Sequence, residues 1–391
     1  MIACPAAGEA LPRPTLELAD VIRLHGDGLA DVRSEQRKVL SALSACRTSA
    51  LGGHVETCDH CGHQRIAYNS CRNRHCPKCQ GSACAQWMEA RAEELLPVEY
   101  FHVVFTLPDV FNGLALANKR TVYGILFDAV AQTLTDVAAN PKHLGAKIGF
   151  MGILHTWGQN LGLHPHVHCV VPGGGLSPDG TRWIACKPGF FLPVRVLSKV
   201  FRGKFIDLLK QSHAKKPLLG INEDEELTRL IDASVRADWV VYAKPPFGGP
   251  EQVLKYLSRY THRIAISNSR LVAVDDHEVT FRWKDYAHEN RERVMTLEGT
   301  EFLRRFLMHI VPLGFMRIRH FGLLASRFRA ANLSRCRELL AAVVPWLEID
   351  NQSDGATTGV YERCPICGKG EMVRGAFVLA HRIHAVRKDT S

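Results

Sequence analysis

The stretch HPHVHCVV, residues 164–171, places two histidines on either side of a valine. Along a β-strand successive side chains point to opposite faces, so residues two apart share a face. His166 and His168 therefore lie side by side, while Val167 and Val171 point the other way into a core. Two neutral imidazoles on one face are suitable ligands for a divalent metal ion. Ordinary strand histidines give the same pattern, so the motif alone leaves a purely structural role open.

A third histidine strengthens the metal interpretation. His155 lies eleven residues before His166, near the end of the strand-like stretch IGFMGILHTW (148–157). Gly158 and Gly162, with an asparagine between them, are typical of a turn. The spacing predicts a β-hairpin that brings His155 opposite the histidine pair and leaves open positions for a substrate. Three other side chains remain alternatives for the third ligand: Gln159, His164 and His262.

The second informative stretch is PEQVLKYLSRYTHR, residues 250–263. A proline followed by an acidic residue is typical of a helix start. Tyr256 and Tyr260 are four residues apart, so they share one face of this helix, at the border of an apolar stripe. Three basic residues form a cationic stripe beside them: Lys255, Arg259 and Arg263. Structural helices also place aromatic residues at such borders, so this pattern is ambiguous by itself.

Together these elements resemble the HUH endonucleases, in which a histidine–hydrophobe–histidine strand holds a metal ion and a helix presents one or two nucleophilic tyrosines. Longer motifs resemble more closely the two-tyrosine rolling-circle transposases of insertion sequences, which carry an amino-terminal zinc-binding domain. In chain order they are NSCRNRHCPKCQ (69–80), FTLP (105–108), LHTWGQ (154–159), HPHVHCVVPGGG (164–175) and KPPFGGPEQVLKYLSRYTHRIAISN (244–268). The resemblance covers most of the chain.

The resemblance implies an α+β fold whose central, mostly antiparallel sheet carries the histidines and is covered by helices. His155, His166 and His168 would hold a catalytic Mg²⁺ or Mn²⁺ ion on the scissile phosphate. Tyr256 and Tyr260 would attack phosphorus and form 5′-phosphotyrosines.

The implied activity is rolling-circle transposition, in which single-stranded DNA at the element's ends is nicked and rejoined to target DNA. Strand separation would come from a host helicase or the replication machinery. A plasmid relaxase, a rolling-circle replication initiator and a non-catalytic zinc-containing DNA-binding protein remain the alternatives.

Two CxxC knuckles separated by fourteen residues predict a structural zinc site. Its four predicted ligands are Cys58, Cys61, Cys76 and Cys79. Four further side chains nearby can replace one of these or help to form a second site: His63, Cys71, His75 and Cys84. A last knuckle, Cys364 and Cys367, has no matching CxxC, and His381 and His384 are the candidates to complete it.

The net charge of +10 and the isoelectric point of about 9.0 indicate a polyanionic partner. Residues 302–337 contain eight arginines and no carboxylate, and residues 60–88 are also basic without an acid. Two such runs favour contact with the DNA backbone over a merely solvated face. The residues predicted to contact DNA are Arg72, Arg74, Lys255, Arg259, Arg263, Arg317 and Arg319.

Thirteen cysteines, several of them in CxxC pairs, favour reduced thiols and metal binding over a disulfide framework. Because no leader-like or membrane-spanning run occurs, we expect a bacterial cytoplasmic, nucleoid-associated protein with no membrane partner. Five segments are expected: a helical segment (1–50), a zinc module (51–92), the catalytic domain (95–290), a helical basic DNA-binding region (291–349) and a mobile tail with the last knuckle (350–391).

Overall fold

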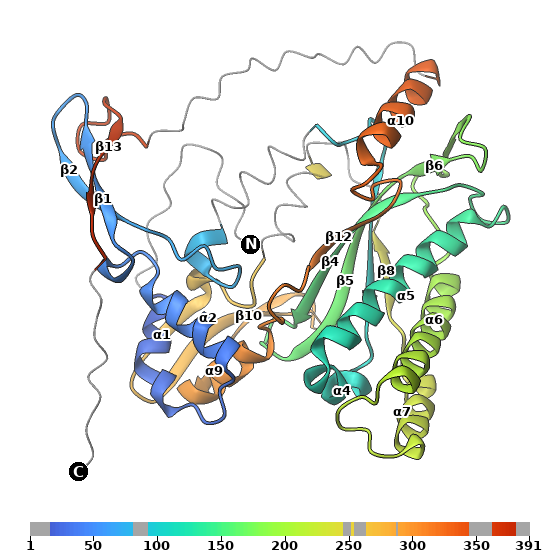
Figure 1. Ribbon diagram of the computed structural model, residues 1–391, viewed down its shortest axis with the longest axis horizontal. Helices are drawn as coiled ribbons and strands as arrows, with labels where there is room; N and C mark the ends of the chain where they lie inside the picture. The colour runs from blue at the N-terminus through green and yellow to red at the C-terminus, as the bar shows by residue number, and fades with distance from the viewer. Residues whose placement is uncertain are drawn as a thin grey trace.

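The computed structural model describes residues 16–80, 93–244, 252–253, 263–286, 288–343 and 362–380. At its centre lies a five-stranded sheet in the order β12-β4-β5-β3-β8, with every neighbouring pair antiparallel (Figure 1). Its strands are β3 (Tyr100–Thr106), β4 (Gly149–Trp157), β5 (Leu163–Pro172), β8 (Val241–Lys244) and β12 (Ile318–Gly322). The predicted α+β fold with a mostly antiparallel central sheet is therefore confirmed.

Helices cover one face of this sheet, on the right of Figure 1. They are α4 (Asn112–Ala117), α5 (Lys119–Ala139), α6 (Val194–Lys215) and α7 (Asp224–Arg236). The large core between helices and sheet contains Phe105 and Val167 from the strands with Phe127 and Phe201 from the helices. All nine residues of β4 are buried, so both faces of the sheet are covered at this strand. Strands that are buried on both faces have nearly continuous apolar sequences, and β4 and β5 contain such apolar runs.

The β4–β5 hairpin forms as the histidine spacing predicts. At its turn, the N–H of Gly158 donates to the carbonyl oxygen of Gly162 at 2.9 Å, and Leu161 takes a positive φ of 62°. The register sets His155 directly opposite His166. One strand of this hairpin therefore presents its histidine to the pair on the other.

A second core joins the amino-terminal helices to a three-stranded sheet and a helix from much later in the chain. Its elements are α1 (Leu18–His25), α2 (Ser34–Ala45), β9 (Leu271–Val274), β10 (Glu278–Asp285), β11 (Arg291–Glu298) and α9 (Gly299–Met308). Val21, Phe281, Phe302 and Phe306 are buried in it. The helices expected over the amino-terminal segment are present, but they pack on residues that the sequence analysis assigned to other segments.

Two segment assignments need correction. Residues 291–349, expected to be helical, contain β11 and β12 besides α9 and α10 (Arg329–Val343), and β12 pairs with β4 of the central sheet. Residues 362–380, expected to lie in a mobile tail, contain β13 (Met372–Val378), which pairs with β1 (Gly53–Cys58) beside β2 (Gln64–Tyr68). β12 and β13 each pair with a strand far away in sequence, and local periodicity cannot predict such pairing.

A small two-stranded sheet, β6 (Gly174–Leu176) and β7 (Trp183–Ala185), extends beyond β5. Among the helices that the structure describes, none is at once long enough and apolar enough to cross a membrane.

The packing of β3 gives a stability prediction. Phe105 is fully buried, and its ring meets that of Phe201 edge-on at a centroid distance of 5.2 Å. Phe105→Ala should lower the free energy of unfolding by about 3–5 kcal/mol, because a cavity is left beneath the sheet. Urea denaturation followed by tryptophan fluorescence measures this.

The matched control is Phe328→Ala, at a side chain that is 57% exposed. Its effect should stay within about 0.5 kcal/mol. Equal losses in the two variants would contradict the assignment of Phe105 to the principal core.

Candidate active site and cysteine clusters

Three histidines meet on the face of the central sheet opposite helices α5 and α6. The ring centroids lie 5.5 Å apart for His155 and His166, 4.5 Å for His155 and His168, and 4.7 Å for His166 and His168. One ring nitrogen from each lies within 4.8 Å of the others. His155 and His168 are buried and His166 is half-buried. The structure thus brings together all three of the predicted ligands.

Burial keeps the imidazoles of His166 and His168 neutral. It lowers the pKa of His166 to about 3 and that of His168 well below its usual range. In both cases the positive charge of Arg263 adds to the lowering of the pKa. A neutral imidazole offers a nitrogen lone pair, so the donor set suits a divalent ion at neutral pH.

The second nitrogen of two histidines is also engaged. Nδ1 of His166 lies 2.6 Å from the carbonyl oxygen of His164, and Nδ1 of His168 lies 2.8 Å from Nε2 of His102. Metal-binding histidines characteristically donate their other N–H in this way, which fixes the ring and leaves Nε2 for the metal. The observed contacts therefore fit the use of these histidines as ligands.

His102 was missed by the sequence analysis. It is buried on β3, and its ring stacks on that of His168 at a centroid distance of 5.0 Å. Burial lowers its pKa to about 3, so its ring is neutral, and in the tautomer with hydrogen on Nδ1 its Nε2 accepts from His168. Its place in an alternating strand was visible in the sequence, but the β3–β5 register that brings it to His168 was not.

Two alternative third ligands have other partners. Gln159 donates from Nε2 to the hydroxyl oxygen of Tyr286 at 3.2 Å. His164 lies 3.9 Å from Asp109, near the surface. His262, the third alternative, lies outside the described residues. Among the described candidates for the third ligand, His155 is the one with a ring nitrogen within 4.8 Å of those of His166 and His168.

Arg263, whose charge acts on two of the histidines, is itself held by a second arginine. Arg317 donates from Nη1 to the carbonyl oxygen of Arg263 at 3.2 Å and so holds the main chain of that residue. Burial lowers the pKa of Arg317 to about 10. Its buried position does not support the predicted direct contact of Arg317 with DNA. Instead, the contact favours a role of Arg317 in positioning Arg263.

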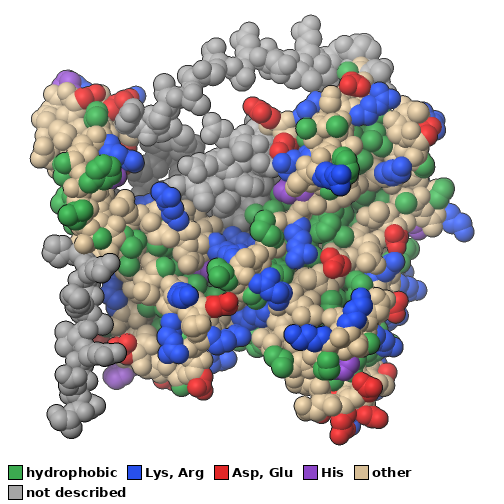
Figure 2. Space-filling view, in the orientation of Figure 1, with side chains coloured by type: hydrophobic (Ala, Val, Ile, Leu, Met, Phe, Trp, Pro, Cys, Tyr) green, Lys and Arg blue, Asp and Glu red, His purple; other side chains and the backbone are tan. Residues whose placement is uncertain are grey.

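The other residues predicted to contact DNA differ in exposure. Arg72 is exposed, whereas Arg74 donates to the carbonyl oxygen of Phe315 at 2.6 Å. Arg319 lies over the ring of Phe127, 4.4 Å from its centroid. Lys255 and Arg259 lie outside the described residues. Figure 2 shows lysine and arginine side chains gathered across the middle of one face of the molecule.

The arginine-rich run 302–337 is partly neutralised by acids from elsewhere. Arg329 pairs with Glu94 at 3.2 Å, and Arg305 pairs with Glu301 at 2.7 Å. The lack of carboxylates within the run therefore overstates the local positive charge.

The two tyrosines, Tyr256 and Tyr260, lie outside the described residues. Of the helix that the sequence predicts for them from Pro250, the structure describes Gln252 and Val253, both helical. Val253 is fully buried against Met151, Ile153 and Val170. Ile153 is the cross-strand partner of His168, so Val253 packs on the face of the sheet that carries the histidines.

Four cysteines near the amino terminus form a compact cluster. Its members are Cys46, Cys71, Cys76 and Cys79. Sγ of Cys46 lies 3.5 Å from that of Cys76 and 3.6 Å from that of Cys79, and Sγ of Cys71 lies 3.7 Å from that of Cys79. Zn–S bonds of about 2.3 Å in a tetrahedron give S···S edges of about 3.8 Å, so the thiols fit a zinc ion.

This cluster corrects the predicted zinc ligands. Cys76 and Cys79 belong to it, but Cys58 and Cys61 meet Cys364 and Cys367 instead. The physical reason is the β1–β2 hairpin, which carries Cys58 and Cys61 to its tip. Cys46, at the end of α2, belongs to the cluster although it is in no CxxC motif and was not predicted as a ligand. Cys71 was among the predicted alternative ligands. His381, His384 and Cys84 lie outside the described residues.

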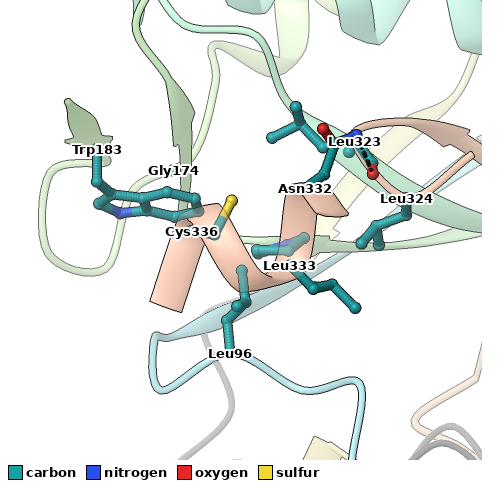
Figure 3. Close-up of a pocket in the computed structure, with 10 residues that line it drawn as sticks. Leu96, Gly174, Trp183, Leu323, Leu324, Asn332, Leu333 and Cys336 are labelled. Carbon is teal, nitrogen blue, oxygen red and sulfur yellow. Dashed lines mark hydrogen bonds between the residues drawn. The ribbon is translucent and has the colours of Figure 1, made fainter. Parts of the chain in front are cut away.

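A pocket near α10 has a different character (Figure 3). Leu333 and Cys336 of α10 face Leu96 and Trp183, and Asn332 donates to the carbonyl oxygen of Leu323 at 2.9 Å. Its cavity volume of about 10 Å³ is roughly that of one water molecule. This pocket is therefore a packing defect rather than a substrate site.

Comparison with known proteins connects these sites. Residues 149–332 match the family described as "Putative transposase", and residues 21–107 match the "Transposase zinc-binding domain". The first match spans the three histidines and the second spans the amino-terminal cysteine cluster, which is thereby supported as a structural zinc site. No solved structure matches the chain.

Two relatives extend over most of the chain. The protein named "Putative transposase y4qJ" of Sinorhizobium fredii is 53% identical over 91% of this chain and 94% of its own length. The "Transposase for insertion sequence element IS801" of Pseudomonas savastanoi pv. phaseolicola is 30% identical over 82% of this chain and 77% of its own length.

The His102–His168 contact leads to a prediction for metal affinity. His102→Phe should weaken Mn²⁺ binding by about 10–100-fold, because the ring of His168 loses the acceptor that orients it. His102→Gln should recover most of the affinity, since its amide oxygen can accept the same N–H. Isothermal titration with Mn²⁺ measures both variants.

A role for His102 in packing alone predicts a different pattern, in which the two substitutions have similar effects. Unchanged Mn²⁺ affinity in His102→Phe would remove the residue from the site.

Proposed function

Because this chain belongs to the IS91- and IS801-type transposases and has their zinc-binding domain, we propose that it cuts and rejoins single-stranded DNA at its element's ends through tyrosine transesterification. The observation that supports this most directly is the cluster of three histidines on the sheet face where Val253 packs, two of which burial keeps neutral. Family membership by itself establishes DNA as the substrate and transposition as the process.

His155, His166 and His168 would hold a divalent ion through one nitrogen each. When bound, Mg²⁺ or Mn²⁺ supplies Lewis acidity to the scissile phosphate. Mg²⁺ prefers oxygen ligands, so a three-histidine set favours Mn²⁺ or a softer ion. Arg263 adds a fixed positive charge that attracts the phosphate and stabilises charge that develops on it.

Tyr256 and Tyr260 are the proposed nucleophiles. They follow Val253 by three and seven residues, and in a continuous helix these positions lie on nearly the same side. Because Val253 packs on the histidine face, a helix that continues from it would direct both hydroxyls towards the metal ligands. The tyrosine oxygen forms a bond to phosphorus while the bond to the 3′-oxygen breaks, which yields a 5′-phosphotyrosine and a free 3′-hydroxyl.

The phosphotyrosine keeps the energy of the broken phosphodiester, so rejoining requires no nucleotide hydrolysis. Strand separation is then a separate process, which we assign to a host helicase or to replication. The amino-terminal zinc ion has a structural role in this scheme, since four cysteine thiolates leave no open position for a substrate.

The metal proposal is tested by covalent capture. His166→Ala with His168→Ala should lower formation of the protein–DNA adduct at least about 100-fold, because the phosphate loses its Lewis acid. Affinity for the same single strand should change little, since arginines supply most of the backbone contacts. Gel analysis of adducts with and without Mn²⁺ gives the rate.

His277→Ala is the matched control, because this histidine is exposed and lies in the turn between β9 and β10 of another sheet. Wild-type adduct formation in the double alanine variant at saturating DNA would exclude a catalytic role for the pair. Loss of adducts in the control as well would indicate misfolding rather than chemistry.

Two successive nucleophiles predict a distinctive mutant pattern. Tyr256→Phe and Tyr260→Phe should each abolish transposition, while each single variant still forms one type of adduct on a single-stranded end. The double variant should form none. Tyr68→Phe, at a surface position on β2, is the control and should remain active.

Full transposition by both single variants would contradict a two-tyrosine cycle. Partial activity in each, with loss only in the double variant, would show that the tyrosines are interchangeable rather than sequential.

A further inference from the structure

Cysteines from opposite ends of the chain form a second compact cluster. Sγ of Cys58 lies 3.7 Å from that of Cys367, and Sγ of Cys61 lies 3.7 Å from that of Cys364. All four sulfurs lie within 4.8 Å of one another. The paired residues are more than three hundred positions apart in sequence.

The two contributing knuckles have the same local structure. The N–H of Cys58 donates to the carbonyl oxygen of His63, and the N–H of Cys364 donates to that of Gly370, both at 2.8 Å. A glycine with a left-handed φ follows each CxxC, at 71° for Gly62 and 65° for Gly368. Both loops therefore turn back on themselves and direct their two sulfurs to a common point.

Main-chain N–H groups also point at the sulfurs. The N–H of Cys61 donates to Sγ of Cys58 at 3.4 Å, and the N–H of Gly370 donates to Sγ of Cys367 at 3.5 Å. Such bonds stabilise the thiolate form, which is the form that binds metal. Two CxxC loops that face each other with these bonds have the arrangement of a zinc ribbon.

The sulfur distances discriminate between possible bonds. A disulfide requires about 2.05 Å between sulfurs, far less than the 3.7 Å found here. A tetrahedral Zn(Cys)₄ site requires S···S distances of about 3.8 Å. Apart from the four cysteines, Met372 is the hydrophobic side chain buried with the cluster among the described residues. A metal ion would therefore take the place of an apolar core here.

The surrounding strands reinforce the same junction. β13 pairs with β1 from Gly53 opposite Val378 to Cys58 opposite Met372. Arg65 contacts Glu56 at 2.8 Å and Glu362 at 2.5 Å, so one guanidinium links the hairpin to the carboxy-terminal segment.

We propose that Cys58, Cys61, Cys364 and Cys367 bind a second structural zinc ion, which fastens the carboxy-terminal segment to the β1–β2 hairpin. This site is separate from the one at Cys46, Cys71, Cys76 and Cys79. It takes two of its ligands from residues beyond both family matches, which end at positions 107 and 332. It does not depend on the proposed tyrosine chemistry.

Zinc content of the full-length protein tests the proposal. Elemental analysis after gel filtration, with all chains carrying His166→Ala and His168→Ala so that the histidine site holds no ion, should find two zinc ions per chain where the cysteines are wild type and one in Cys58→Ser and in Cys364→Ser. The double variant should also retain one, because both residues hold the same ion. Cys186→Ser, at a thiol outside both clusters, is the control and should retain two.

The retained ion reports that the amino-terminal cluster is still folded, so loss of the second ion is distinguishable from general unfolding. Cys46→Ser combined with Cys364→Ser should remove both ions. Substitution with Co²⁺ gives an independent measure, since thiolate-to-cobalt absorption should fall by about half in Cys364→Ser, as expected when one of two four-thiolate sites is lost.

Three results would overturn the proposal: one zinc ion per chain where the cysteines are wild type, two in Cys364→Ser, or loss of a further ion in the Cys58 and Cys364 double variant. Loss of the same ion in Cys58→Ser and Cys76→Ser would show that the two amino-terminal knuckles share a site after all.

Discussion

The alternation of side chains along β5 is the constraint on which the active-site face depends. Val167 and its neighbours two residues apart are locked into the principal core, so the histidines between them must point the other way. A slip of one residue would bury His166 and His168 among phenylalanines and expose the valines to the site. Hydrophobic packing on one face of the sheet thus sets the ligand geometry on the other, with β3 and β4 holding the register from both sides.

The charge of the site follows from the same burial. Neutral imidazoles do not cancel the charge of a bound divalent ion, in contrast to carboxylate ligands. A metal held by His155, His166 and His168 would keep its full attraction for a phosphate. Arg263 adds to that field, and the buried Arg317 holds its main chain in place. This combination suits a polyanionic substrate, because the histidine ligands add no negative charge that would repel it.

What the sequence predicted well was local. The histidine hairpin and the α+β class follow from alternation, turn residues and helical periodicity within short windows. The cysteine pairing was wrong because three similar knuckles can combine in several ways, and spacing favours neighbours. The actual partners of Cys58 and Cys61 are chosen by the pairing of β13 with β1. The pairing of β12 with β4 and the contact of His102 with His168 could not be predicted for the same reason. Pairing between strands that are distant in sequence produces no periodic pattern in the sequence.

The closure of β1 by β13 has a consequence for synthesis on the ribosome. The hairpin with Cys58 and Cys61 emerges about three hundred residues before the strand and the two thiols that complete it. At 5–20 residues per second this interval is on the order of 15–60 s, during which one strand edge is unpaired. A chain cut short between Arg263 and β13 would contain every proposed catalytic residue and yet keep that edge open. Completion of this small sheet therefore depends on translation through Val378.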